Sequence, residues 1–135
     1  MSKPFIISIV DDDEIYKFTV KKTLEIKNLA KKILAFSDGE EAIKFLFDNL
    51  SNVDKLPDLI FLDINMPIMD GFQFMDEYVK IHPKVGKKIT IYMVTSSVDP
   101  VDYENAKKYR QISDFIVKPI NAEELEAIIN SINEE

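Results

Sequence analysis

The feature that most constrains the fold of this chain is a regular alternation of short apolar runs with longer amphipathic stretches. Strands separated by helices are joined by right-handed crossovers, which place the strands parallel in one sheet. The alternation therefore predicts a doubly wound α/β domain with a five-stranded parallel sheet. The predicted strands are residues 5–10, 33–36, 59–63, 90–95 and 114–118.

Helices are predicted after each of these strands, and capping residues mark most of their starts. The first covers residues 14–28, with Tyr16, Val20 and Leu24 at four-residue spacing. Ser37 is predicted to cap the second helix, with Glu40 at the capping-box position. The third and fourth helices are expected to end near His82 and Tyr109. The remaining starts are marked by a turn at residues 70–71, by Asp99 before Pro100, and by Asn121 with Glu124.

Composition limits the functions that are open to the chain. Its 135 residues, 46% of them hydrophobic, are enough for one domain with a packed core. A net charge of −7 argues against nucleic acid as a direct partner. The absence of Cys excludes disulfides and thiolate metal sites. We find no signal peptide and no apolar segment long enough for a membrane span, so we expect a cytoplasmic protein that does not bind a membrane.

Reactive or polar residues stand at the ends of four of the five predicted strands. Ligands gather at the carboxyl ends of the strands in such sheets, so we expect these side chains to meet in one shallow pocket. They are Asp11, Asp12 and Asp13 after the first strand, Asp63 after the third, Thr95 and Ser96 after the fourth, and Lys118 after the fifth.

This set of side chains suits phosphoryl transfer. Clustered carboxylates repel one another unless a cation lies between them, and oxygen ligands suit a hard ion such as Mg²⁺. A carboxylate can also accept a phosphoryl group and form an aspartyl-phosphate. The transferring group spreads its charge over three oxygens, so it needs a divalent ion, a cationic side chain and a hydrogen-bond donor. Asp11 and Asp12 can help hold the ion, Lys118 can pair with one oxygen, and Thr95 can donate to another.

Four segments, in chain order, resemble the motifs of response regulator receiver domains of two-component systems. They are residues 9–13 (IVDDD), 62–71 (LDINMPIMDG), 94–96 (VTS) and 117–119 (VKP). The resemblance spans the chain from the first strand to the last. It implies a flavodoxin-like (βα)5 fold with strand order 2-1-3-4-5, forming a receiver domain over residues 1–135 without an output domain. It implies signalling by docking, and no enzymatic activity beyond phosphorylation and dephosphorylation of the domain itself.

The resemblance also implies partners and a metal. Asp63 would accept a phosphoryl group from a histidine kinase or phosphotransfer protein, and the modified domain would dock on a downstream protein. Mg²⁺, or Mn²⁺ in its place, would be held by Asp12, Asp63 and the backbone carbonyl of Asn65. Asp11 would contribute to the metal site mainly through water.

The same resemblance implies which residues bind the phosphoryl group and which form the switch. Thr95 and Lys118 would bind the phosphoryl group, and Ser96 beside Thr95 leaves the register of the hydroxyl open. Thr95 and Phe115 would form the switch. The peptide bond between Lys118 and Pro119 is expected to be cis, as X-Pro bonds permit.

Other interpretations remain open. The acids of residues 11–13 can cap the first helix, and Asp63 alone can begin an Asx-turn. The same acids weakly resemble the start of haloacid-dehalogenase-like phosphohydrolases, in which Asp11 rather than Asp63 would be the nucleophile. A pseudo-receiver would bind partners without phosphorylation.

The remaining charged residues are interpreted as surface. The basic positions of the first helix are read as a solvated face, with partner docking as the alternative, and His82 as a surface residue. Basic residues of the fourth helix near acidic residues of the last can support a phosphorylation-dependent homodimer instead of a monomer. These positions are Lys17, Lys21, Lys22 and Lys27 in the first helix, Lys107, Lys108 and Arg110 after the fourth strand, and Glu123, Glu124 and Glu126 in the last helix.

Overall fold

A single parallel sheet forms the centre of the molecule, with the strand order β2-β1-β3-β4-β5. The computed structural model describes residues 5–96 and 99–133. The predicted fold class and strand order are confirmed. The central strands β1 and β3 are buried along their whole length, whereas the edge strands β2 and β5 are partly exposed. The strands are β1 (Ile6–Val10), β2 (Lys32–Phe36), β3 (Leu59–Asp63), β4 (Thr90–Thr95) and β5 (Ile112–Val117).

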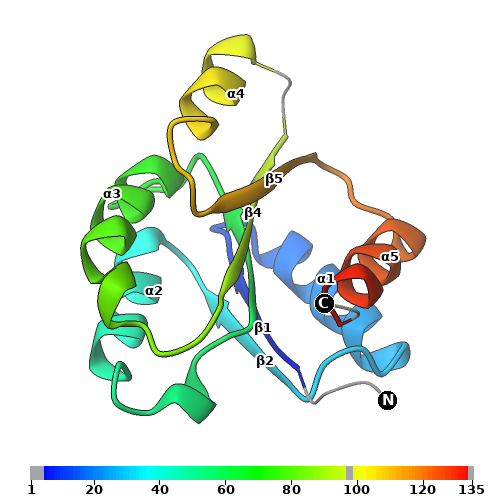
Figure 1. Ribbon diagram of the computed structural model, residues 1–135. Helices are drawn as coiled ribbons and strands as arrows, with labels where there is room; N and C mark the ends of the chain where they lie inside the picture. Colours follow the sequence, from blue (N-terminus) through cyan, green and yellow to red (C-terminus); the bar gives the residue numbers. More distant parts are fainter. Residues whose placement is uncertain (1–4, 97–98, 134–135) are drawn as a thin grey trace.

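Helices cover both faces of this sheet. In Figure 1, α1 and α5 lie on one face and α2 and α3 on the other, while α4 lies close to β5. None of the described helices combines the length and the apolar character that a bilayer span requires. The helices are α1 (Glu14–Ile26), α2 (Gly39–Asp48), α3 (Gly71–Ile81), α4 (Pro100–Ala106) and α5 (Ala122–Asn133), with 3-10 turns at Val53–Lys55 and His82–Lys84.

The alternation of side chains along β3 divides the interior into two cores. Leu59 and Phe61 pack under α1 and α5, whereas Ile60 and Leu62 pack under α2 and α3. Burial of apolar side chains of this size contributes about 1.5–3 kcal/mol each to stability. The first core also contains Ile7, Ile9, Val20, Leu24, Leu125 and Ile129, and the second contains Val10, Leu46, Phe74, Met75, Tyr78 and Met93.

The N-cap of α2 lies one residue beyond the predicted position. Asp38, not Ser37, caps the helix, and its Oδ1 accepts a hydrogen bond from the N–H of Glu41 at 3.0 Å. The hydroxyl of Ser37 instead accepts a hydrogen bond from Lys17 Nζ at 3.0 Å. The prediction of Ser37 was wrong because a contact between distant elements occupies its side chain.

Three element boundaries also differ from the prediction. Helix α1 ends at Ile26 rather than near residue 28, and α4 ends at Ala106 rather than near Tyr109. Tyr109 lies outside the helix because its ring stacks on Phe72 of α3 and its hydroxyl donates to Asp76 Oδ1 at 2.7 Å. Strand β5 begins at Ile112, two residues before the predicted start. The predicted caps Asp99 and Asn121 are confirmed.

The amino ends of the strands are held together by Asp58. Its Oδ2 accepts a hydrogen bond from the N–H of Ile6 at 2.8 Å, and its Oδ1 lies 2.8 Å from Lys87 Nζ. This edge of the sheet therefore carries its own structural ion pair. The carboxyl ends, where β1 and β3 deliver Asp11 and Asp63, form the opposite edge.

Candidate functional site

Three carboxylates converge at the carboxyl ends of β1 and β3. Asp11, Asp12 and Asp63 each offer an oxygen within 4.8 Å of the others. Asp11 and Asp63 are buried, whereas Asp12 is exposed. Oδ1 of Asp11 accepts a hydrogen bond from the N–H of Asp13 at 2.9 Å, whereas the buried Oδ2 accepts none of suitable geometry from the described residues. An all-oxygen set with an under-used buried oxygen suits a hard divalent cation such as Mg²⁺.

Lys118 places its ammonium group against this cluster. Its Nζ lies 2.7 Å from Asp11 Oδ2 and 3.8 Å from Asp63 Oδ1. The first contact is a close ion pair with the buried oxygen of Asp11. The backbone N–H of Lys118 donates to the carbonyl of Thr95 at 2.7 Å, and the peptide bond to Pro119 is cis. Strands β4 and β5 thus deliver Thr95 and Lys118 to the same edge as the carboxylates.

Asp63 has an altered acidity in this environment. Burial is the largest cause that raises the pKa of its carboxyl group from 3.8 to about 7, and the neighbouring charge of Asp11 adds to it. Lys118 opposes this shift because its ammonium group favours the ionised form. A cation bound among the carboxylates would act in the same direction as Lys118 and keep Asp63 ionised.

The backbone around Asp63 is held closely against α3. The N–H of Ile64 donates to the carbonyl of Val94 at 3.1 Å, and the N–H of Gly71 donates to the carbonyl of Ile64 at 2.9 Å. A Cβ atom on Gly71 would collide with the Asp63 carbonyl oxygen and approach the Ile64 Cα to 3.1 Å. The connecting loop contains Ile68 at φ 68°, which is a strained conformation for a β-branched residue.

Asp13 belongs to α1 rather than to the carboxylate cluster. Its Oδ1 accepts hydrogen bonds from the N–H groups of Ile15 and Tyr16, both at 3.0 Å. The capping interpretation therefore applies to Asp13. Asp11 and Asp12 lie with Asp63 in the acidic cluster.

The other predicted site residues lie at different depths. Thr95 is buried at the end of β4, whereas Ser96 and Asn65 are exposed. Phe115 is half-buried on β5, and its ring meets that of Tyr103 edge-to-face with centroids 5.7 Å apart. Of the two neighbouring hydroxyl residues Thr95 and Ser96, Thr95 is thus the one that is buried at this edge.

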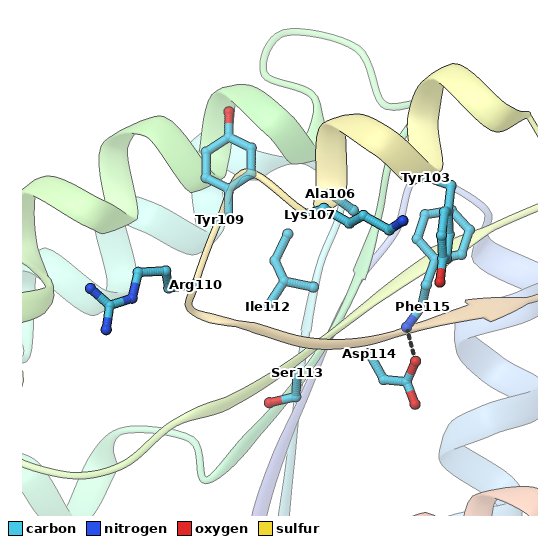
Figure 2. Close-up of a pocket in the computed structure, with 9 residues that line it drawn as sticks. All are labelled: Tyr103, Ala106, Lys107, Tyr109, Arg110, Ile112, Ser113, Asp114 and Phe115. Carbon is cyan, nitrogen blue, oxygen red and sulfur yellow. Dashed lines mark hydrogen bonds between the residues drawn. The ribbon is translucent and has the colours of Figure 1, made fainter.

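A cavity of about 320 Å³ lies between α4 and β5, apart from the acidic cluster. Figure 2 shows Tyr103 and Phe115 side by side at one end of it and Arg110 at the other. Lys107 also lines this cavity, pairs with Glu104 at 3.3 Å, and lies over the ring of Tyr103. The residue expected to switch therefore borders a hollow in the α4–β5 surface.

Two residues near the site were not predicted to have roles there. Tyr16 was assigned only to the apolar stripe of the first helix, but its ring lies 4.2 Å from Lys118 Nζ. Burial, then the charges of Asp11 and Asp63, raise the pKa of its hydroxyl. Lys17 was assigned to a solvated face, and that prediction was wrong. It is buried, because Nζ reaches Ser37 Oγ at 3.0 Å and pairs with Glu14 at 2.9 Å.

Comparison with known proteins agrees with this arrangement. Residues 7–130 match the family described as response regulator receiver domain. The sensor histidine kinase CheAY of Helicobacter pylori is 30% identical over 93% of this chain, which spans 14% of that kinase. The crystal structure of a two-component response regulator from Cytophaga hutchinsonii is 25% identical, with a TM-score of 0.85 over 98% of this chain and 100% of that one. Chemotaxis protein CheY4 of Vibrio cholerae is 26% identical, with a TM-score of 0.76 over 96% and 99% of the two chains. The chain therefore belongs to the response regulator receiver domain family.

Proposed function

We propose that this chain is a phosphorylation switch in which Asp63 accepts a phosphoryl group from a histidine kinase or phosphotransfer protein. The observation that carries the proposal is the meeting of three carboxylates within 4.8 Å, with Lys118 Nζ close to two of them. We further propose that this receiver domain signals by docking. Its downstream target would be a protein.

The chemistry follows from the placement of the side chains. An ionised oxygen of Asp63 attacks the phosphorus of a phosphohistidine donor, the new O–P bond forms as the P–N bond breaks, and the imidazole leaves with the electron pair. Lys118 pairs with one phosphoryl oxygen, and the hydroxyl of Thr95 donates to another. Mg²⁺ or Mn²⁺ held by Asp11, Asp12, Asp63 and the Asn65 carbonyl would neutralise charge on the transferring group.

Phosphorylation would change the α4–β5 surface. The phosphoryl group places about two negative charges at a buried strand end, and these attract Thr95 and Lys118. Lys118 is hydrogen-bonded to Thr95 through the backbone, so β4 and β5 respond together. Movement of Phe115 beside the cavity in Figure 2 would alter the surface that a target, or a second copy of the chain, contacts.

Acetyl phosphate provides the direct test, since it needs no knowledge of the kinase. The protein is incubated with MgCl2 and acetyl phosphate, and intact-mass spectrometry is expected to show the gain of one phosphoryl group. Asp63→Asn should abolish the gain, whereas Asp54→Asn, which removes an exposed carboxylate from the Val53–Lys55 turn, should retain it. Absence of any gain in the wild-type chain with Mg²⁺ or Mn²⁺ would favour the pseudo-receiver alternative.

A comparison of Asp63→Asn with Asp11→Asn separates the proposed switch from a phosphohydrolase. Asp11 is held by the N–H of Asp13 and pairs with Lys118 more closely than Asp63 does, at 2.7 Å against 3.8 Å, which favours Asp63 as the nucleophile. Steady hydrolysis of a phosphate ester that Asp11→Asn abolishes and Asp63→Asn retains would support the phosphohydrolase instead.

A further inference from the structure

We propose that Tyr16 is a positioning residue of this site, whose ring holds the Lys118 ammonium group beside the carboxylates while a divalent cation occupies them. The proposal concerns a side chain of α1 that the motifs do not mark. Its consequence for phosphorylation rests on the proposed function, but the placement of Lys118 can be measured without it.

The Tyr16 side chain is held in place by the start of α1 and by the core. Asp13 caps the helix and accepts a hydrogen bond from the Tyr16 N–H at 3.0 Å, which sets the backbone. The half-buried side chain packs against the core under α1 and α5. The remaining part of the ring faces Lys118, whose Nζ lies 4.2 Å from its centroid. This distance is well within the range of a cation–π contact.

The balance of charges around Lys118 shows why the ring matters. In the absence of metal, the negative charges of Asp11 at 2.7 Å and Asp63 at 3.8 Å attract the ammonium group in addition to the ring. A divalent cation bound by the same carboxylates would share their negative charge and repel the ammonium group. The aromatic face attracts a cation but carries no net charge that the metal can neutralise. Tyr16 is therefore the contact that keeps Lys118 in place when phosphoryl transfer requires it.

The test compares Tyr16→Phe, which keeps the ring, with Tyr16→Leu, which keeps only apolar volume. Phe18→Leu is the matched control, because Phe18 is an exposed aromatic residue of the same helix whose ring lies near Lys22 rather than near the site. Proton NMR of the lysine-labelled chain, with Lys118 assigned through Lys118→Arg, measures the ring-current shift of the Lys118 Cε protons with and without MgCl2. The rate of phosphorylation by acetyl phosphate is measured on the same variants.

An upfield shift of the Lys118 protons is expected in the wild-type chain, in Tyr16→Phe and in Phe18→Leu, and it should persist with MgCl2. Tyr16→Leu should lose the shift and slow phosphorylation about fivefold, the fold-change that corresponds to about 1 kcal/mol of cation–π attraction. The phosphorylation rate of Tyr16→Phe should stay within about twofold of the wild-type rate.

A shift that MgCl2 abolishes in the wild-type chain, or equal slowing by the Phe and Leu variants, would overturn the proposal. If the wild-type chain is not phosphorylated at all, the proposed function fails while the NMR measurement still decides the placement of Lys118.

Discussion

At the scale of single residues, Asp63 shows how burial and charge compete in one carboxyl group. The proposed role as phosphoryl acceptor requires an ionised carboxylate, yet burial and Asp11 raise the pKa of Asp63 to about 7. Lys118 offsets part of this effect, and a bound cation would offset more of it. In the proposed function, Asp63 would therefore be a good nucleophile only when the positive partners around it are in place.

This shift predicts that the stability of the metal-free protein depends on pH through Asp63. The pKa is raised on folding, so the folded chain binds this proton more tightly than the unfolded chain, and stability is lost as pH rises from about 4 through about 7. Asp63→Asn removes the dependence. The test compares the unfolding free energy of Asp63→Asn with that of wild type, both measured by urea denaturation in EDTA. The gain of Asp63→Asn over wild type should be about 2 kcal/mol larger at pH 8 than at pH 5.5. A gain that is the same at both pH values would contradict the shifted pKa.

The sequence was sufficient to identify most of the residues that the structure brings to this edge. Asp11, Asp63, Thr95 and Lys118 could be placed because a parallel sheet sends the carboxyl ends of its strands to one edge, whatever the details of packing. The position of Tyr16 over Lys118 could not be predicted, because it depends on how α1 rests on the sheet. Lys17 was misassigned for the same reason, since helical spacing does not reveal that a Lys reaches across to Ser37.

At the scale of elements, α3 is the helix on which the site depends most closely. It begins at Gly71, next to the backbone of Asp63 and Ile64. A capping box fixes its start, since Asp70 and Gln73 exchange hydrogen bonds of 2.8 and 2.9 Å between side chain and backbone. The position of the helix and that of Asp63 are therefore set together.

Replacement of Gly71 by Ala should disturb the positions of both α3 and Asp63. The added Cβ would collide with the Asp63 carbonyl oxygen, which is backbone and cannot move aside without displacing β3. We expect a loss of about 1–3 kcal/mol in unfolding free energy, together with slower phosphorylation. The control is Gly86→Ala, where the nearest atom is a methyl group of Val53 at 3.0 Å, on an exposed side chain. Equal stability of the two variants would refute the steric argument.

Element boundaries were harder to predict than the elements themselves. Ser37 and Asp38 are both good capping residues with a Glu three positions later, so the motif alone left the start of α2 uncertain by one residue. The end of α4 was missed because Tyr109 leaves the helix to pack on Phe72. In both places a contact with another element decides between two locally similar conformations.

At the scale of the whole molecule, the acidic edge is supported from both faces of the sheet. The core under α1 and α5 carries Tyr16, and the core under α2 and α3 lies beneath the loop that follows Asp63. Unfolding of either core would separate the carboxylates. Metal binding at the site would therefore be coupled to the stability of the entire domain.

This coupling predicts that Mg²⁺ raises global stability at neutral pH. A ligand that binds only the folded state at a hundredfold above its Kd adds about 2.7 kcal/mol. Thermal unfolding with MgCl2 and with EDTA should show the difference for the wild-type chain and for Asp54→Asn. Asp12→Asn and Asp63→Asn should lose most of it. A similar rise in Tm in all four proteins would mean that the effect arises outside the acidic cluster.

The ion pair of Asp58 and Lys87 at the amino ends of the strands has a practical consequence. Because this edge is held by its own contacts and lies opposite the carboxylates, a fluorescent reporter or an affinity tag inserted beside exposed Gly86 would leave the chemistry untouched. The same insertion after Asp63 would not be tolerated. The molecule thus keeps an exposed loop for an insertion at the edge opposite the acidic cluster.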